Sequence, residues 1–239
     1  MSNKARVGIT IPFYKNEIQL AKCKAAIKAQ TFQDIEVFVF NNTEKNHGFT
    51  RACNMGLRNF LTSKDYNIIL NQDCYLEPDA IEKMVTFMNS EPDCAIAGIK
   101  QVSTLDNDKI MHGGCTTAYP NGMHYVGSVK AGHHNKNRKM PWVNGACMIV
   151  NNSLIPEFGY MDENYFLICS DSDWCYTARQ RGFSVWYIAD AVCKHEEGGI
   201  SRKNDNTFLT DKMRDDTLYF SDKWIGNGCF RELSMEIFE

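Results

Sequence analysis

The chain has 239 residues, of which 44% are hydrophobic and 23% are charged, and its formal net charge is −3. This composition is ordinary for a soluble globular protein and excludes an intrinsically disordered chain. The negative net charge also disfavours a nucleic-acid partner, because proteins that bind nucleic acid usually carry a basic face.

The first hundred residues alternate between short apolar runs and segments of helical periodicity. The runs are rich in β-branched residues, as buried strands are, and the longer segments repeat their apolar residues at helical spacing. The predicted strands are 6–11, 35–40, 66–71 and 94–99, and the predicted helices are 17–30, 49–61 and 78–88. This alternation predicts right-handed crossovers and a parallel sheet with both faces covered. We expect the first strand to end at Pro12.

The second half of the chain is less regular. Residues 104–141 are rich in Gly, His, Asn and Lys and have weak periodicity. After them we predict a strand at 143–150 and then a helix that begins near Ser153. The remaining predicted elements are strands at 184–189 and 191–195 and helices at 172–181 and 207–224. The whole pattern predicts an α/β fold in one domain, 1–239, with a mostly parallel central sheet flanked by helices.

Ten cysteines are spread along the chain without a C-x-x-C pair, so the spacing of a zinc ribbon is absent. Several lie in apolar runs, as Cys147 and Cys193 do, and we interpret them as small buried hydrophobes in a reducing compartment. The opening MSNKAR does not lead into a long apolar region, and no stretch approaches the roughly 20 apolar residues that span a bilayer. We expect a cytoplasmic protein without a transmembrane segment, and peripheral membrane contact is left open.

Several catalytic motifs are absent. The chain has no G-x-x-x-x-G-K-[ST], so it has no P-loop, and no G-x-G-x-x-G follows its first predicted strand. G-x-S-x-G is missing, which disfavours an α/β-hydrolase. H-E-x-x-H is missing too, because His195 is followed by Glu-Glu-Gly-Gly. These absences disfavour nucleoside triphosphatases, dinucleotide oxidoreductases, serine hydrolases and zinc proteases.

Asn71, Gln72 and Asp73 follow the third predicted strand. Ligands bind such sheets at the carboxyl ends of the strands, so a carboxylate here would face the ligand crevice. Mg²⁺ and Mn²⁺ are hard cations that prefer oxygen, and Asp73 could help to hold one together with diphosphate oxygens. A second interpretation is that Asp73 only binds backbone amides of a turn. The spacing alone leaves both interpretations open.

Two further candidates lie in the second half. Asp171 and Asp173 begin a predicted helix, where carboxylates are electrostatically favoured, so capping explains at least one of them. The same pair could also supply a general base and its support. His195 closes a predicted strand, and a histidine in that place is either structural or a ligand.

Taken together, these segments resemble the family-2 glycosyltransferases with the GT-A fold, particularly the bacterial and viral rhamnosyltransferase-like branch. The resemblance covers nearly the whole chain. It is carried by VGITIPFYKNEIQL, VFVFNNT, HGFTRACNMGLR and NIILNQDCYLEPDAI, and most strongly by WVNGACMIVNNSLIPEFGYMDENYFLICSDSDWCYTARQRGFSVWYIADAVCKHEEGGIS. The last stretch is similar to the family's Gly-Phe-Asp-Glu, Glu-Asp-x-Asp and strand-end His pattern.

The resemblance implies a GT-A-type nucleotide-diphospho-sugar transferase fold and an inverting hexosyltransferase. Residues 1–100 would form the nucleotide-binding half, 101–205 the sugar- and acceptor-binding half, and 206–239 a C-terminal helical segment. Asp171 stands at the position of the general base, and Asp73 and His195 stand at the position that holds Mn²⁺ or Mg²⁺. The donor would be a UDP- or dTDP-sugar, and the acceptor a hydroxyl of a glycan, glycolipid or glycoprotein. Such enzymes serve polysaccharide biosynthesis.

The resemblance also implies a set of donor-binding positions, mostly at the ends of the first-half strands. They are Pro12, Tyr14, Glu17, Asn41, Asn42, Arg51, Asn54, Asn71, Gln72, Asp73, Trp142, Asn144 and Gly145. For Arg51 an exposed helix charge is the alternative interpretation. For Trp142, Asn144 and Gly145 the alternative is the start of a buried strand.

Two residues depart from the family pattern. Asn71 replaces the first Asp of Asp-x-Asp, which removes one charge from the metal position. Ser170 replaces the usual acidic partner of the base, a neighbour that would otherwise influence the pKa of the base.

Two other functions stay open at this point. A sugar nucleotidyltransferase also combines an α/β sheet, a diphosphate and a metal, but it usually opens with a Gly-rich loop, whereas this chain reads IPFYKNE. A non-catalytic module that binds a nucleotide-sugar or a glycan is the other alternative, and the presence of Asp171 argues against it.

Overall fold

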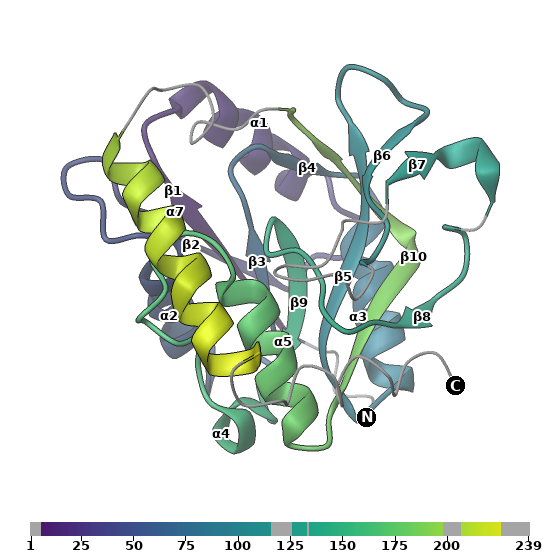
Figure 1. The fold of residues 1–239 in the computed structure, drawn as a ribbon. Coiled ribbons are helices and arrows are strands. Elements are labelled where there is room, and N and C mark those ends of the chain that lie inside the picture. The colour runs from purple at the N-terminus through teal and green to yellow at the C-terminus, as the bar shows by residue number, and fades with distance from the viewer. Residues whose placement is uncertain (1–5, 116–125, 133, 198–206, 226–239) are drawn as a thin grey trace.

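The computed structural model describes residues 6–115, 126–132, 134–197 and 207–225. Its centre is a mixed sheet with the order β2-β1-β3-β9-β5-β10-β4 (Figure 1). These strands are β1 (Val7–Phe13), β2 (Ile35–Asn41), β3 (Tyr66–Leu70), β4 (Cys74–Leu76), β5 (Cys94–Ser103), β9 (Cys147–Asn151) and β10 (Ser184–His195). Three short strands join its margin: β6 (Lys109–His112), β7 (Gly127–Ser128) and β8 (Arg138–Lys139).

The strand directions explain where a site can form. β1 pairs in parallel with β2 and β3, and β5 pairs in parallel with β10, while β9 runs antiparallel between β3 and β5. The strands β1, β2, β3, β5 and β10 therefore point the same way, and their carboxyl ends share one edge of the sheet. β9 and β4 run in the opposite direction. The sheet is mixed and mostly parallel, as the sequence predicts.

Helices cover both faces of the sheet. One apolar core holds side chains of α1 (Glu17–Lys28) and α3 (Ala80–Ser90) against the sheet. The other core holds side chains of the remaining helices and their neighbours: α2 (Phe49–Phe60), α4 (Ile155–Phe158), α5 (Ser170–Gln180), α7 (Thr207–Phe220) and the π-helical turn η2 (Ser221–Ile225). A short 3-10 turn, η1 (Val129–Ala131), follows β7. The result is a three-layer α/β sandwich.

Some predicted boundaries are wrong for identifiable reasons. β1 continues through Pro12 to Phe13, because beyond Thr10 it pairs only with β2, so a residue without an N–H is tolerated there. The two strands predicted at 184–189 and 191–195 form one strand, β10, with an irregularity between Ile188 and Val192. The sequence prediction also missed β4 and the short strands of the middle segment.

The predicted helices are close to the observed ones. The last of them, expected over 207–224, is α7 followed by η2. No helix among the described residues is long and apolar enough to cross a membrane. Nine of the ten cysteines lie in the described part, and all nine are buried. The division of the chain at 100 and 205 stays a prediction, and residues 226–239 of the expected C-terminal segment lie outside the described residues.

The helix α2 packs tightly on β1 at Gly56. A Cβ atom built there would lie 2.0 Å from Thr10 Oγ1, far inside normal contact. Thr10 in turn donates to Asn67 Oδ1, and the Asn67 amide donates to the Gly56 carbonyl oxygen. The close approach thus joins helix and sheet through a buried polar cluster.

We expect Gly56→Ala to lower the free energy of unfolding by about 1–3 kcal/mol, the usual cost of overpacking a core. Helix propensity acts in the opposite direction by about 1 kcal/mol, so the sign of the change tests the packing. Urea unfolding measures it. Met55→Ala is the neighbouring control, because Met55 is exposed and its loss should change stability by less than about 0.5 kcal/mol. A more stable Gly56→Ala protein would contradict the packing.

Candidate functional site

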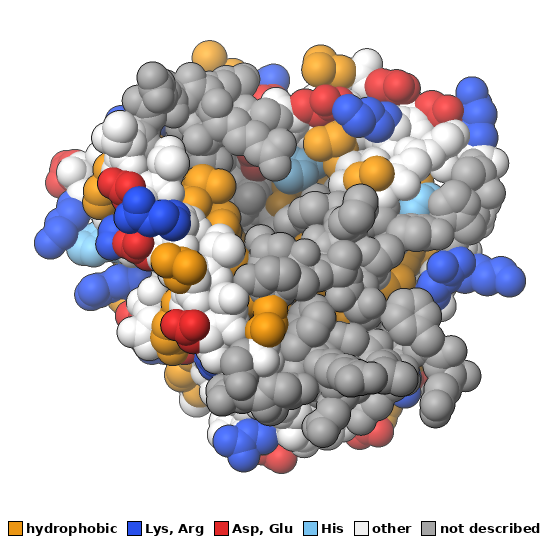
Figure 2. All heavy atoms as spheres, in the orientation of Figure 1, with side chains coloured by type: hydrophobic (Ala, Val, Ile, Leu, Met, Phe, Trp, Pro, Cys, Tyr) orange, Lys and Arg blue, Asp and Glu red, His pale blue; other side chains and the backbone are white. Residues whose placement is uncertain are grey.

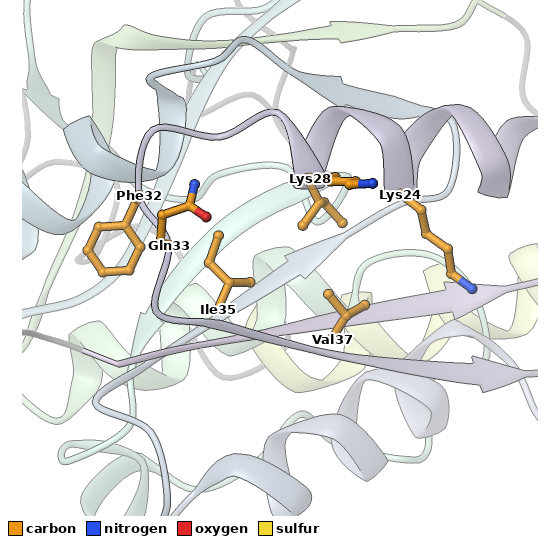
Figure 3. A pocket seen from close by; sticks show the side chains of 7 residues that line it. Lys24, Lys28, Phe32, Gln33, Ile35 and Val37 are labelled. Atoms are coloured by element: carbon orange, nitrogen blue, oxygen red, sulfur yellow. The ribbon is translucent and has the colours of Figure 1, made fainter.

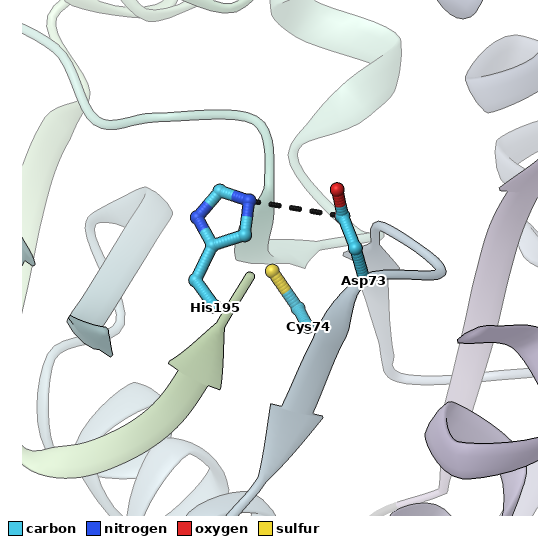
Figure 4. Close-up of side chains that lie close together, drawn as sticks. All are labelled: Asp73, Cys74 and His195. Atoms are coloured by element: carbon cyan, nitrogen blue, oxygen red, sulfur yellow. Dashed lines mark ion pairs between the residues drawn. The ribbon is translucent and has the colours of Figure 1, made fainter. Parts of the chain in front are cut away.

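Asp73, Cys74 and His195 meet at the carboxyl edge of the sheet (Figure 4). Asp73 lies in the turn between β3 and β4, Cys74 begins β4, and His195 ends β10. Cys74 and His195 face each other as an antiparallel cross-strand pair, which places their side chains on the same side of the sheet. One ligand atom from each of the three residues lies within 4.8 Å of the others. In the space-filling view, a histidine side chain lies at the floor of a hollow in the upper part of the face shown (Figure 2).

The environment of Asp73 is suited to binding a cation. Its Oδ1 atom is buried without a hydrogen bond among the described residues, and it lies 3.7 Å from His195 Nε2. Burial raises the pKa of Asp73 above its ordinary value, and Glu196 nearby acts in the same direction, whereas His195 opposes the shift. A bound cation would offset the cost of burying this charge. The residues present therefore fit a divalent metal ion.

A ladder of amide groups fixes the orientation of His195. The backbone N–H of Ala146 donates to Asn144 Oδ1 at 2.9 Å, and the Gln101 amide donates to the same oxygen at 3.2 Å. Gln101 must therefore turn its carbonyl oxygen toward His195 Nδ1, 3.0 Å away. The proton of the neutral imidazole then sits on Nδ1, and the Nε2 lone pair faces Asp73. His195 Nε2 and Asp73 Oδ1 are then two hydrogen-bond acceptors that face each other, and a cation between them could bind both.

Asp171 lies in the first turn of α5 and is partly exposed. The N–H of Gly145 donates to Asp171 Oδ2 at 2.8 Å, and the N–H of Ser172 donates to Oδ1 at 2.9 Å. Glycine at position 145 favours this close approach, because a Cβ there would make tight contacts of 3.0 Å with Phe49 Cζ and 3.2 Å with Asp171 Cβ. Since Gly145 follows Asn144, the same segment contacts both the carboxylate and the ladder that holds His195.

Asp173 has a structural role that differs from the role expected of Asp171. It is 1% exposed and accepts hydrogen bonds from Tyr165, Trp224 and Lys223. It therefore ties α5 to η2 instead of facing the crevice. The two carboxylates that the sequence left as alternatives are thus separated, and only Asp171 is directed to the sheet edge.

Glu196, next to His195, also has a structural environment. It accepts hydrogen bonds from Gln19, Lys22 and Tyr75. Burial alone would raise the pKa of Glu196, but these donors outweigh it and lower the pKa. A carboxylate satisfied in this way has less to gain from a cation than Asp73 has.

Several expected donor-binding side chains have other partners. Gln72 accepts a hydrogen bond from the Tyr14 N–H and donates one to Gln19. Asn42 accepts from the His47 N–H and donates to the Gly48 carbonyl oxygen. Asn54 is fully buried and hydrogen-bonds to the Met161 backbone and to the Glu163 carboxylate. Trp142 is 2% exposed in the core. These four side chains thus stabilise loops and packing, and their part in donor binding stays a prediction.

The other residues expected to bind the donor are partly buried or exposed. Tyr14 and Asn71 are partly buried at the ends of β1 and β3, and the Asn71 N–H donates to the Ala146 carbonyl oxygen at 2.8 Å. Pro12 is partly buried within β1. Three more, Glu17, Asn41 and Arg51, are exposed near the amino or carboxyl ends of α1, β2 and α2. Their roles stay predictions.

Sequence reasoning missed three residues of the site: Cys74, Gln101 and His112. Cys74 was interpreted only as a buried hydrophobe. Gln101 lies in the part of β5 beyond its predicted end, and it is 1% exposed. His112 accepts the Asn144 N–H through Nε2 at 3.2 Å. The run Lys-Gln-Val-Ser after Ile99 does not alternate between polar and apolar residues, so the local pattern carries no signal for a longer strand.

Strained backbone lies next to two elements that carry site residues. The only non-glycine residues with positive φ in the described part of the chain are Lys15, just after β1, and Cys169, just before α5. Strain of this kind tends to collect at functional sites, where the surrounding structure holds it in place.

A pocket of about 330 Å³ lies elsewhere, between α1 and the edge strand β2 (Figure 3). Lys24 and Lys28 border it on the helix side, and Ile35 and Val37 border it on the strand side. Ile35 and Val37 belong to the amino-terminal half of β2, so this pocket is not part of the carboxyl-edge site.

Comparison with known proteins identifies the family of the chain. The family model described as "Glycosyltransferase like family 2" matches residues 9–214. The low-salt glycan biosynthesis hexosyltransferase Agl10 of Haloferax volcanii is 23% identical over 160 residues, which cover 62% of this chain and 48% of the relative. The dTDP-rhamnosyl transferase RfbF of Shigella flexneri is 27% identical over 160 residues, which cover 66% of this chain and 52% of the relative. The chain thus spans about half the length of the curated relatives it matches.

Solved structures show the same fold. The mannosyltransferase PcManGT from Pyrobaculum calidifontis, in complex with GDP-Man and Mn²⁺, matches with a TM-score of 0.63 at 13% identity, covering 94% of this chain and 65% of that one. GalNAc-T7 with UDP, GalNAc and Mn²⁺ also has a TM-score of 0.63, at 14% identity, covering 82% of this chain and 44% of that one. The GT-A-type fold expected from the sequence is confirmed.

We expect His195 to carry its proton on Nδ1 when the ring is neutral, because Gln101 presents a carbonyl oxygen to that atom. Gln101→Leu should allow both tautomers, since it removes the acceptor. Nitrogen-15 NMR of histidine-labelled protein distinguishes the tautomers. Gln180→Leu, an exposed change at the end of α5, is the matched control. A wild-type ring protonated on Nε2 would show that the ladder is assigned in the wrong direction.

Proposed function

Since this chain belongs to glycosyltransferase family 2, we propose that it transfers a sugar from a nucleoside-diphosphate donor to a hydroxyl group, with inversion at C1. The donor is a UDP- or dTDP-sugar, and the acceptor is a glycan, a glycolipid or a glycoprotein. Relatives named for hexosyl and dTDP-rhamnosyl transfer support the donor class. The work of the enzyme would be glycan biosynthesis.

One observation carries this proposal. Asp171 and the Asp73–His195 pair lie on the same sheet edge and are joined through Gly145, Asn144 and Gln101. An inverting transfer needs a base on the acceptor side of C1 and charge stabilisation on the leaving-group side. This edge offers one carboxylate for the first task and a cation-binding pair for the second.

The side chains divide the chemistry between them. Asp171 would accept the proton of the acceptor hydroxyl as its oxygen attacks C1 from the face opposite the diphosphate. The Gly145 and Ser172 N–H groups hold this carboxylate in one orientation. Asp73 and His195 would hold the divalent ion, Mn²⁺ or Mg²⁺, which when bound stabilises the charge of the leaving diphosphate as a Lewis acid.

We expect Asp171→Asn to lower turnover by about 10²–10⁴-fold, the usual contribution of general acid–base catalysis, while donor binding is retained. Turnover is measured as free nucleoside diphosphate, and donor affinity by calorimetry. Asp211→Asn on the exposed face of α7 is the control and should not change the rate. Full activity of Asp171→Asn would contradict the assignment of Asp171 as the general base. Release of pyrophosphate by the wild type would indicate nucleotidyl transfer instead of sugar transfer.

We expect Asp73→Ala and His195→Ala to weaken the response of activity to Mn²⁺ or Mg²⁺ together, because each removes one member of the pair. The measurement is the metal concentration that gives half-maximal activity, taken for each variant. Asp211→Asn again serves as the control. If both site variants kept the wild-type metal titration, the metal would have to bind elsewhere.

A further inference from the structure

We propose that Cys74 is a third protein ligand of this metal position and that the resulting Asp–Cys–His site takes a thiophilic divalent ion of the Zn²⁺ class. The inference rests on the proposed function, since it concerns the same edge of the sheet. It goes beyond that function because it names a ligand and a metal preference that the Mn²⁺ or Mg²⁺ expectation does not contain.

The sheet register brings the thiol to the site. Cys74 pairs with His195 across β4 and β10, so the two side chains leave the sheet on the same face. Figure 4 shows the Cys74 sulfur directed into the space between the His195 ring and the Asp73 carboxylate. All three ligand atoms lie within 4.8 Å of one another. The thiol therefore has the correct position to share a cation with the other two.

The distances suit a small tetrahedral ion. Bond lengths of about 2.0–2.3 Å around such an ion place its ligand atoms roughly 3.3–3.6 Å apart. Asp73 Oδ1 and His195 Nε2 are already 3.7 Å apart. The three ligand atoms lie within 4.8 Å of one another, so a shift of at most about 1.2–1.5 Å would bring the sulfur into the same range. No large rearrangement of the strands is needed.

The donor atoms determine which ion is preferred. Mg²⁺ and Mn²⁺ suit carboxylate, carbonyl and water oxygens, whereas thiolate and imidazole favour Zn²⁺ and related ions. Two of the three donors here are of the second kind. Three protein ligands with a fourth position open is also the usual arrangement of catalytic zinc. The open position would face the crevice, where a diphosphate oxygen could complete the set.

Two further observations make the site receptive. Asp73 Oδ1 is buried without a hydrogen bond among the described residues, and Asp73 is 8% exposed. The Gln101–Asn144 ladder turns the His195 Nε2 lone pair toward the same point. As the sulfur–metal bond forms, the Cys74 S–H proton passes to solvent, so the step exchanges a proton for a cation and needs no oxidant.

The test uses the full chain freed of metal with a chelator and titrated with Cd²⁺, with no donor or acceptor present. We expect the ultraviolet thiolate-to-cadmium band to appear at one equivalent in the wild type and to be lost in Cys74→Ala. Cys94→Ala is the matched control, because Cys94 is equally buried in the same sheet but begins β5 at the opposite end. Its band should equal that of the wild type.

Competition with Zn²⁺ gives the affinity. Cys74→Ala should weaken Zn²⁺ binding by more than the roughly 10–100-fold that loss of a second-shell partner costs, and should change Mn²⁺ binding much less. If Cys74→Ala does not fold, His195→Gln replaces it: this variant keeps the thiol, and we expect its Cd²⁺ affinity to fall at least about tenfold.

A band that persists in Cys74→Ala, or no band at one equivalent in the wild type, would overturn the proposal. So would equal Cd²⁺ affinity in His195→Gln and the wild type. The outcome is separable from the proposed function: sugar transfer with Mn²⁺ and no band would leave the transferase standing without the thiol ligand. A band without any sugar transfer would leave the metal site without the transferase.

Discussion

The reversed direction of β9 is the constraint on which the site depends. β9 runs antiparallel to both β3 and β5, so its beginning, and not its end, lies at the edge where the parallel strands finish. The segment before it therefore passes along that edge. There the Ala146 carbonyl oxygen accepts the Asn71 N–H, and Gly145 reaches Asp171. A fully parallel sheet would have placed this segment at the other end.

The same segment fixes the orientation of the His195 ring through a set of buried hydrogen bonds. Each such bond contributes only about 0.5–1.5 kcal/mol net, but a buried amide that loses its partner costs about 1–3 kcal/mol. Gln101, 1% exposed between Asn144 and His195, is therefore costly to turn around. Since the Ala146 N–H fixes one end of the ladder, the ring at the other end has one favoured tautomer. The charged groups of the crevice are thus oriented before any ligand arrives.

The sequence predicts the parts of this arrangement that depend on local pattern. Continuous apolar runs identify β1, β2, β3 and β5, and the ends of strands identify Asp73 and His195 as candidates. The direction of β9 could not be predicted, because an apolar run reads the same in either direction. The contact of Cys74 with His195 could not be predicted either, since it follows from the register of a three-residue strand. Asp171 and Asp173 could be separated only by the partners that η2 supplies.

Asn71 and Cys74 both make the proposed metal position less suited to a hard cation such as Mg²⁺. Asn71 takes the place of a carboxylate, so the site has one negative charge fewer with which to attract a hard cation. The cross-strand partner of His195 on β4 is Cys74, whose thiol favours a softer ion. In the described part of the chain, Asp73 Oδ1 has no hydrogen bond, so this hard oxygen can still bind a cation. In the metal site that we propose, the missing carboxylate and the neighbouring sulfur would change the preference among metals more than the ability to bind one, because a buried Asp73 carboxylate would still need a counter-ion.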